Sequence, residues 1–136
     1  MIRQVDGDKF VCMDNILTGK PCLIYSFGIA NDWTFEDFMD YKGCEIHAHD
    51  PTVDFPAERG NNTHFYKKGK KDETTNTLAS ILAENGHTES VIEYLKIDIE
   101  EYELAAFPDW LATGALKHVN QVALELHLTK LHEPPK

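Results

Sequence analysis

Cys22-Leu-Ile-Tyr-Ser-Phe27, followed by Gly28, is a mainly apolar and β-prone run. Such a run, closed by a turn-forming residue, predicts a buried strand. Thr34 then opens a helical pattern that ends at Gly43, and Glu45-Ile-His-Ala-His-Asp50 returns to a strand pattern. A strand, a helix and a second strand in this order predict parallel pairing through a right-handed crossover.

The alternation of strands and helices continues towards the C-terminus. Further strands are predicted at residues 63–66, 90–99 and 119–128, and further helices at 76–85 and 101–115. Gly86 is a C-cap candidate, and Pro108 is expected to break or restart its helix. Residues 9–13 are expected to be a short strand or an entry segment, and 54–62 a loop. The predicted fold class is therefore α/β, with a Rossmann-like, doubly wound and mainly parallel sheet.

The composition limits the class of protein. The 136 residues suit one domain, predicted to span 1–136 with its motifs in 22–128, and 42% hydrophobic with 26% charged residues is ordinary for a globular chain. The net charge of −10 predicts no nucleic-acid partner, because phosphates are bound mainly by Lys and Arg. No apolar run reaches the length of a membrane span and no signal-peptide pattern is present, so no span is expected, and the compartment is left unassigned.

The cysteines and most histidines are scattered. Cys12, Cys22 and Cys44 form neither a CxxC pair nor a zinc-finger spacing, and Cys22 and Cys44 are expected to be buried free thiols. The histidines expected to be surface or packing residues are His47, His49, His64, His87, His118 and His132. We therefore assign no metal ligands.

Polar residues stand where the predicted strands end, and these ends would lie at one edge of a parallel sheet. Gly28 allows a sharp turn and a close approach of the backbone to a ligand. Asp50, about 22 residues later, takes the position from which a carboxylate bonds ribose hydroxyls in nucleotide-binding sheets. Because the full GxGxxG pattern is absent, a nucleoside ligand without phosphate is favoured over a dinucleotide.

Two later strands carry charged residues with a period of two. Lys96, Asp98 and Glu100 share one face of their strand, where burial would require partners or a cleft. Asp98 and Glu100 are expected to face a cleft, whereas Lys96 is either catalytic or structural. Glu125 and His127 share a face of the last strand. Together with Asp98 they would orient a substrate, act as a general base or bind a hard divalent cation.

Four segments resemble the FkbM-like class I methyltransferases, most closely the animal methyltransferase-like proteins of that group. They are Leu23–Phe35, Cys44–Pro51, Tyr94–Glu100 and Gln121–His127. The resemblance implies S-adenosyl-L-methionine as cofactor and methyl transfer, to an oxygen of a small-molecule or glycan acceptor, by in-line displacement at the sulfonium carbon. The alternatives are a catalytically weak or inactive S-adenosylmethionine-binding module and another nucleotide-binding Rossmann-like protein.

The same resemblance implies roles for individual residues. The cofactor-binding residues would be Ser26, Phe27, Gly28 and Ile29 in the first loop, Asp32, Asp50 at the ribose, and Pro51 beside the adenosine. The catalytic residues would be Asp98 near the donor methyl group, and Glu100, Glu125 and His127 towards the acceptor. Some class I O-methyltransferases hold a divalent cation with strand-end carboxylates, which is an arrangement that Asp98 and Glu125 would imitate.

The chain departs from the family pattern at two points. Glu101 follows Glu100, where a small residue, usually glycine, is common. The chain also carries no sequence for the hairpin of the sixth and seventh strands that closes the class I sheet. It is therefore expected to be a shortened form, a piece of a longer protein, or a protomer that completes its sheet through a partner. An open strand at the edge of such a sheet leads us to expect self-association into a homo-oligomer.

Overall fold

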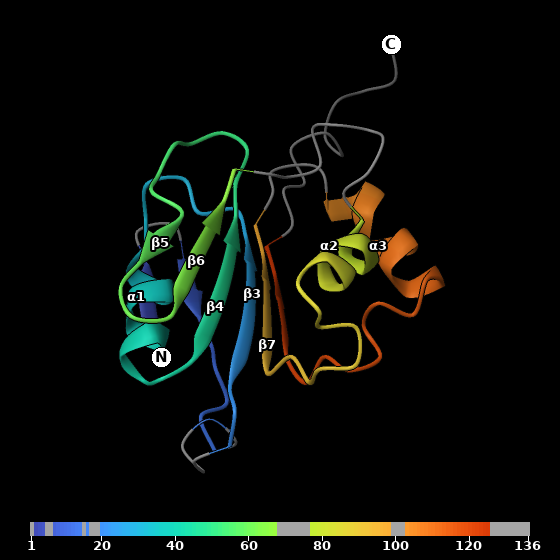
Figure 1. Ribbon diagram of the computed structural model, residues 1–136, viewed down its shortest axis with the longest axis horizontal. Coiled ribbons are helices and arrows are strands. Elements are labelled where there is room, and N and C mark those ends of the chain that lie inside the picture. The colour runs from blue at the N-terminus through green and yellow to red at the C-terminus, as the bar shows by residue number, and fades with distance from the viewer. Residues whose placement is uncertain are drawn as a thin grey trace.

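Eight strands and three helices form the computed structural model (Figure 1), which describes residues 2–4, 7–14, 16, 20–67, 77–98 and 103–125. The strands are β1 (Ile2–Gln4), β2 (Gly7–Lys9), β3 (Leu23–Phe27), β4 (Glu45–His49), β5 (Glu58–Arg59), β6 (Thr63–Tyr66), β7 (Tyr94–Ile97) and β8 (Val122–Leu124). The helices are α1 (Thr34–Tyr41), α2 (Leu78–Glu84) and α3 (Glu103–Ala112).

Six of the strands form one sheet in the order β5-β6-β4-β3-β7-β8. All neighbours pair in parallel except β5 and β6, which are antiparallel. The chain runs outward from β3 through β4 to β6 and then crosses back to β7, so the strand order reverses between β3 and β7. The doubly wound, mainly parallel sheet predicted from the sequence is thus confirmed.

Helices cover both faces of the sheet. Figure 1 shows α1 on one face, and α2 and α3 on the other. In α1, Phe35 and Met39 lie one turn apart and are fully buried, whereas Tyr41 points outward with 83% of its surface exposed. In α2, Thr77 caps the first turn by accepting the Ser80 N–H. Among the described residues, no helix has both the length and the apolar character that a bilayer crossing requires.

Each face of the sheet therefore has its own apolar core. The period of two along β3 sends Ile24 towards α1 and Tyr25 towards α2. The core on the α1 face includes Ile24, Phe35, Met39, Ile46 and Phe65. The core on the α2 face includes Tyr25, Phe27, Ile81, Leu95 and Trp110. Residues at the strand ends are thereby held between two packed layers.

Some predicted elements need correction. Residues 9–13 were expected to be a short strand or an entry segment, and of these only Lys9 lies in a strand, at the end of β2, which pairs with β1 in a separate hairpin. The predicted loop at 54–62 contains the short strand β5. The helix α3 continues through Pro108, because a proline removes a single backbone donor and this one stands exposed at the surface. Of the strands expected at 90–99 and 119–128, the described residues show Tyr94–Ile97 and Val122–Leu124, with an extra bridge between Ile92 and Val119, while residues 99 and 126–128 lie outside the described part of the chain.

The prediction of free thiols at Cys22 and Cys44 is wrong, because these residues form a disulfide. Each stands one residue before a strand, Cys22 before β3 and Cys44 before β4. Since β3 and β4 pair in parallel and in register, their starts lie side by side and the two sulfur atoms meet. Cys12 is a free and exposed cysteine. The disulfide thus ties together the beginnings of the two strands whose ends carry Gly28 and Asp50.

Candidate functional site

The carboxyl ends of four consecutive strands bring predicted site residues to one edge of the sheet. Asp50 follows β4, Gly28 follows β3, Asp98 follows β7 and Glu125 follows β8. Their backbones continue the sheet ladder, because the N–H groups of Gly28, Asp98 and Glu125 each donate to a carbonyl of the neighbouring strand, at 3.0, 2.9 and 2.9 Å. We call this the carboxyl edge. It contains the reversal of strand order, where open α/β sheets bind their ligands.

Asp50 holds the loop that leaves β3. Its Oδ2 accepts the backbone N–H groups of Ile29 (2.9 Å) and Ala30 (2.8 Å), and its Oδ1 accepts the backbone N–H (2.8 Å) and hydroxyl (2.6 Å) of Thr52. Burial alone would raise the pKa of Asp50, but these hydrogen bonds outweigh burial and hold that pKa below its ordinary value. Four donors occupy the roughly four acceptor positions of a carboxylate. Asp50 can therefore bond a ribose hydroxyl only by exchanging a partner.

Gly28 is required by packing between strand ends. Its φ is +88°, and a Cβ placed there would stand 1.6 Å from the backbone oxygen of Asp98. The sequence predicted that the glycine allows close approach to a ligand, but the group that excludes a side chain in the structure is the backbone of Asp98. Gly28 thus sets how closely the ends of β3 and β7 can lie.

A sealed ion pair lies beneath this edge, between the sheet and α1. Lys96 Nζ is 2.9 Å from Glu36 Oε1, which also accepts the Ser26 hydroxyl at 2.6 Å. The side chains of Lys96 and Glu36 are 3% and 0% exposed. Of the two roles left open for Lys96, this geometry supports the structural one. Glu36 was missed in the sequence because it resembles an ordinary first-turn acidic residue, and only the opposing Lys96 gives it a role.

The loop side chains expected to bind the cofactor mostly point into the protein. Ser26 is fully buried and its hydroxyl donates to Glu36, so only its backbone is left for the expected cofactor loop. Phe27 packs in the core of the α2 face and Ile29 in that of the α1 face. Asp32 Oδ1 accepts the N–H and hydroxyl of Thr34 at the start of α1. This loop therefore offers mainly its backbone to a ligand.

The remaining site predictions divide between two groups. Pro51, Asp98 and Glu125 lie at the carboxyl edge and are partly buried. Glu100 and His127 lie outside the described residues. The structure thus brings Asp98 and Glu125 onto adjacent strands, and the catalytic roles assigned to all four acidic and histidine residues stay predictions.

A second polar cluster lies on the α2 face, where the sequence suggested only scattered histidines. The sheet register pairs His47 on β4 with His64 on β6, and their ring centres are 4.9 Å apart. His87, which follows α2, lies 5.0 Å from the His47 ring, and Glu45 Oε1 is 2.7 Å from His47 Nε2. His47 is buried and His64 and His87 are partly buried, in keeping with a packing role, but the structure brings together three histidines that are scattered in the sequence. The signal for this cluster was the period of two in Glu45-Ile-His47, which needed the register of β6 to be recognised.

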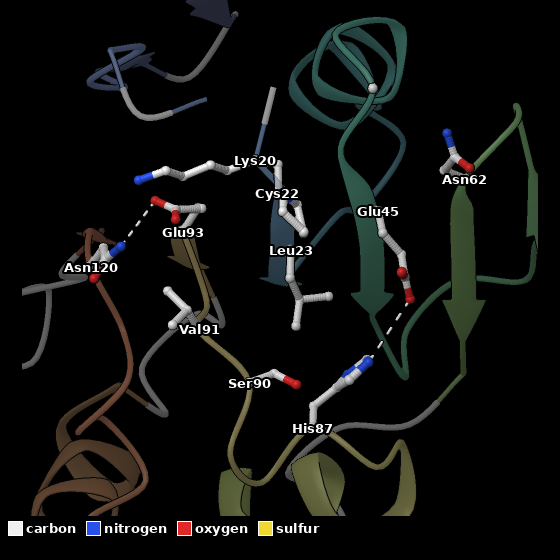
Figure 2. Close-up of a pocket in the computed structure, with 12 residues that line it drawn as sticks. Lys20, Cys22, Leu23, Glu45, Asn62, His87, Ser90, Val91, Glu93 and Asn120 are labelled. Atoms are coloured by element: carbon white, nitrogen blue, oxygen red, sulfur yellow. Dashed lines mark hydrogen bonds and ion pairs between the residues drawn. The ribbon is translucent and has the colours of Figure 1, made fainter. Parts of the chain in front are cut away.

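An open pocket of about 830 Å³ lies at the opposite edge of the sheet, where the strands begin (Figure 2). Its lining includes Cys22, Glu45, His87, Glu93 and Asn120. Figure 2 shows Glu45 and His87 directed towards each other, while Asn120 donates a hydrogen bond to Glu93 at 3.0 Å. We call this the amino edge. It is separate from the carboxyl edge, where the cofactor is expected.

Comparison with known proteins identifies the family. A family described as "Methyltransferase domain" matches residues 1–134. The chain belongs to this methyltransferase family. The methyltransferase domain is also 30% identical over 139 residues to the human protein named "Probable methyltransferase-like protein 24", covering 87% of this chain and 37% of the relative. The rat protein of the same name is 30% identical over 136 residues, covering 89% of this chain and 37% of the relative.

The two relatives are longer than this chain. The methyltransferase domain spans 37% of the length of these two curated relatives. No solved structure matches it. The resemblance to methyltransferases found in the sequence is confirmed, whereas assignment to the FkbM-like subgroup stays a prediction.

Proposed function

We propose that this methyltransferase domain binds S-adenosyl-L-methionine at the carboxyl edge and transfers the methyl group to a hydroxyl oxygen of a small-molecule or glycan acceptor. The observation that carries the proposal is the series of Asp50, Gly28, Asp98 and Glu125 at four consecutive strand ends. This series spans the reversal of strand order, which is the ligand position of open α/β sheets. Family membership supports the reaction class.

The chemistry of the edge suits this cofactor. S-adenosylmethionine supplies an electrophilic methyl carbon on a positively charged sulfur. Asp50, Asp98 and Glu125 carry negative charge, which favours a cation placed within a few ångströms of them. A nucleoside without phosphate also agrees with the first loop, where two backbone N–H groups already donate to Asp50 and are not left for a phosphate.

Each residue has a proposed task. Asp50 keeps the loop in shape and takes the ribose hydroxyls in exchange for the hydroxyl of Thr52, the partner that can rotate away. Asp98 orients the reacting groups at the end of β7. Glu125, on the adjacent strand, accepts the proton of the acceptor hydroxyl as it is aligned for displacement.

The first experiment is a calorimetric titration of the chain with S-adenosylhomocysteine, with NAD as the control ligand. Saturable binding of S-adenosylhomocysteine alone is expected. Binding of NAD alone would replace this proposal with a dinucleotide-binding protein, and binding of neither ligand would overturn the cofactor assignment. Release of S-adenosylhomocysteine from S-adenosylmethionine with a panel of hydroxyl-bearing acceptors then separates an enzyme from a binding module.

Two variants locate the ribose. Asp50→Ala is expected to weaken S-adenosylhomocysteine binding by about 1.5–3 kcal/mol, because charge-assisted hydrogen bonds are lost. Thr52→Val is the matched control, since it removes only the hydroxyl that the ribose would displace, and it is expected to bind as well as the parent chain or better. Unchanged affinity in Asp50→Ala would contradict the position assigned to the ribose.

A further inference from the structure

Three histidines and one carboxylate converge on the α2 face. Ligand atoms of Glu45, His47 and His64 all lie within 4.8 Å of one another. Two imidazoles approach the same oxygen, because Glu45 Oε1 is 2.7 Å from His47 Nε2 and 4.0 Å from His87 Nε2. Two side chains of β4 and one of β6 thus form a close group, and His87, from the segment after α2, approaches this group at Glu45.

Each histidine also has its other ring nitrogen held by a second partner. His47 Nδ1 is 3.0 Å from the Tyr66 hydroxyl, and His64 Nδ1 is 2.9 Å from Glu58. His87 Nδ1 is 2.7 Å from the hydroxyl of Tyr25. A histidine that binds a metal through one nitrogen usually donates its other N–H to a carboxylate, carbonyl or other oxygen, which fixes the orientation of the ring. All three histidines carry this outer shell, and all three have Nε2 left as the inner atom.

We propose that Glu45, His47, His64 and His87 form a binding site for one Zn²⁺ ion. Three imidazole nitrogens and one carboxylate oxygen make the four-coordinate N/O set that Zn²⁺ accepts. The nitrogen-rich set disfavours Mg²⁺ and Ca²⁺, which prefer oxygen ligands. This site is distinct from the carboxyl edge and does not rest on the proposed methyl transfer.

Binding requires a modest contraction of the cluster. Ligands about 2.0–2.1 Å from a tetrahedral Zn²⁺ lie roughly 3.4 Å from one another. The ligand atoms of Glu45, His47 and His64, now within 4.8 Å of one another, must therefore adjust their separations by up to about 1.4 Å. His87 lies outside this group of three and must also turn towards the ion. The side chains of Glu45 and His64 are 50% and 33% exposed and can change rotamer without disturbing the core. His47 is only 6% exposed and supplies the fixed point on β4.

The site has a path for the ion. Glu45 and His87 line the pocket at the amino edge, which is open to solvent (Figure 2). Glu45 is half exposed, so an ion entering this pocket can reach its carboxylate, which contacts the buried His47. The net charge of −10 makes the approach of a cation favourable.

The test is titration of the tag-free chain, freed of metal with a chelator, with Zn²⁺ by calorimetry and with Co²⁺ by visible absorption. One equivalent of each ion should bind, and the Co²⁺ spectrum should have the intensity of a four-coordinate site. The titrations are made in a Cys12→Ser background, because the exposed Cys12 is an unrelated soft ligand. Neither measurement uses the cofactor, so failure here and failure of methyl transfer are distinguishable.

His64→Ala and His87→Ala are expected to weaken Zn²⁺ binding about tenfold or more. His118→Ala is the matched control, because His118 also faces a carboxylate, that of Glu89 at 3.4 Å, but stands apart from the cluster. Circular dichroism checks that each variant folds. If a histidine variant fails to fold, Glu45→Gln, at a half-exposed position, tests the site instead and is expected to weaken Zn²⁺ binding.

Saturable binding that the cluster variants weaken and His118→Ala preserves would support the site. Absence of one-equivalent binding would overturn it. Binding that is unchanged in His64→Ala, His87→Ala and Glu45→Gln would overturn it equally, because the ion would then lie elsewhere.

Discussion

At the carboxyl edge of the sheet the polar groups described above bind one another inside the protein, whereas at the amino edge the bonded polar groups also line an open pocket. Asp50 uses one oxygen on the loop after β3 and the other on Thr52, which follows β4, and Glu36 and Lys96 are buried beneath this edge. Glu45, by contrast, is half exposed and borders a cavity of about 830 Å³. The acidic residues at the two edges thus lie in different environments, one buried and hydrogen-bonded, the other partly exposed to solvent.

The difference concerns what each acidic group can do. A buried carboxylate with its partners in place fixes backbone positions, and removing it leaves those partners unpaired. A half-exposed carboxylate costs little to remove because water replaces it, and for the same reason it can bind an incoming ion. The carboxyl edge is therefore expected to govern stability and shape, and the amino edge to tolerate change.

The strongest test of this contrast is Glu36→Ala against Glu45→Ala. Glu36→Ala leaves the Lys96 ammonium buried without its carboxylate, and we expect the free energy of unfolding to fall by about 3–5 kcal/mol. Glu45→Ala should cost less than about 1 kcal/mol. Urea unfolding of both variants gives the comparison, and equal losses would show that the two edges do not differ in this way.

A pair of glycines gives the next largest effect. Gly28 and Gly43 have similar φ values, +88° and +92°, but a Cβ at Gly43 meets nothing within 4 Å. Gly43→Ala should therefore cost only the backbone strain, about 1–2 kcal/mol. Gly28→Ala adds the collision with Asp98, roughly 1–3 kcal/mol more. Thermal unfolding measures both, and a smaller loss in Gly28→Ala would mean that the ends of β3 and β7 separate easily.

The smallest effect is a pH dependence at the carboxyl edge. Because the pKa of Asp50 is lowered in the folded state, its stabilisation is present above the unfolded pKa and is lost as the pH falls through the folded pKa. Asp50→Asn should thus be less stable than the parent chain by about 1–3 kcal/mol at neutral pH. The difference should shrink below about pH 4. Urea unfolding across this range checks the sign, and a difference that grows on acidification would contradict it.

The sequence predicted the central elements well because their signals are local. The strands β3, β4 and β6 and the helices α1 and α2 combine apolar periodicity with turn or cap residues. The positions of Asp50, Asp98 and Glu125 at one edge then follow from parallel pairing alone. The short strand β5 escaped prediction, since two residues carry too little periodicity to be recognised.

What the sequence did not reveal depends on contacts between distant elements. The Cys22–Cys44 disulfide and the pairing of His47 with His64 both need the register of neighbouring strands. Lys96 could not be assigned because its partner, Glu36, lies 60 residues away on α1. Asp50 was recognised as important, but its use in holding Ile29 and Ala30 became visible only with the loop in place.

The Cys22–Cys44 disulfide bears on how the protein should be prepared. Disulfides form in oxidising surroundings, whereas cysteines stay reduced as thiols in an ordinary cytosol. Chain produced in a reducing host would begin with two thiols at the starts of β3 and β4, beside the pocket that Cys22 lines. Thiolates are themselves zinc ligands. The oxidant used during expression and the reductant used in storage therefore determine whether each titration is made on the disulfide-bonded or the reduced chain.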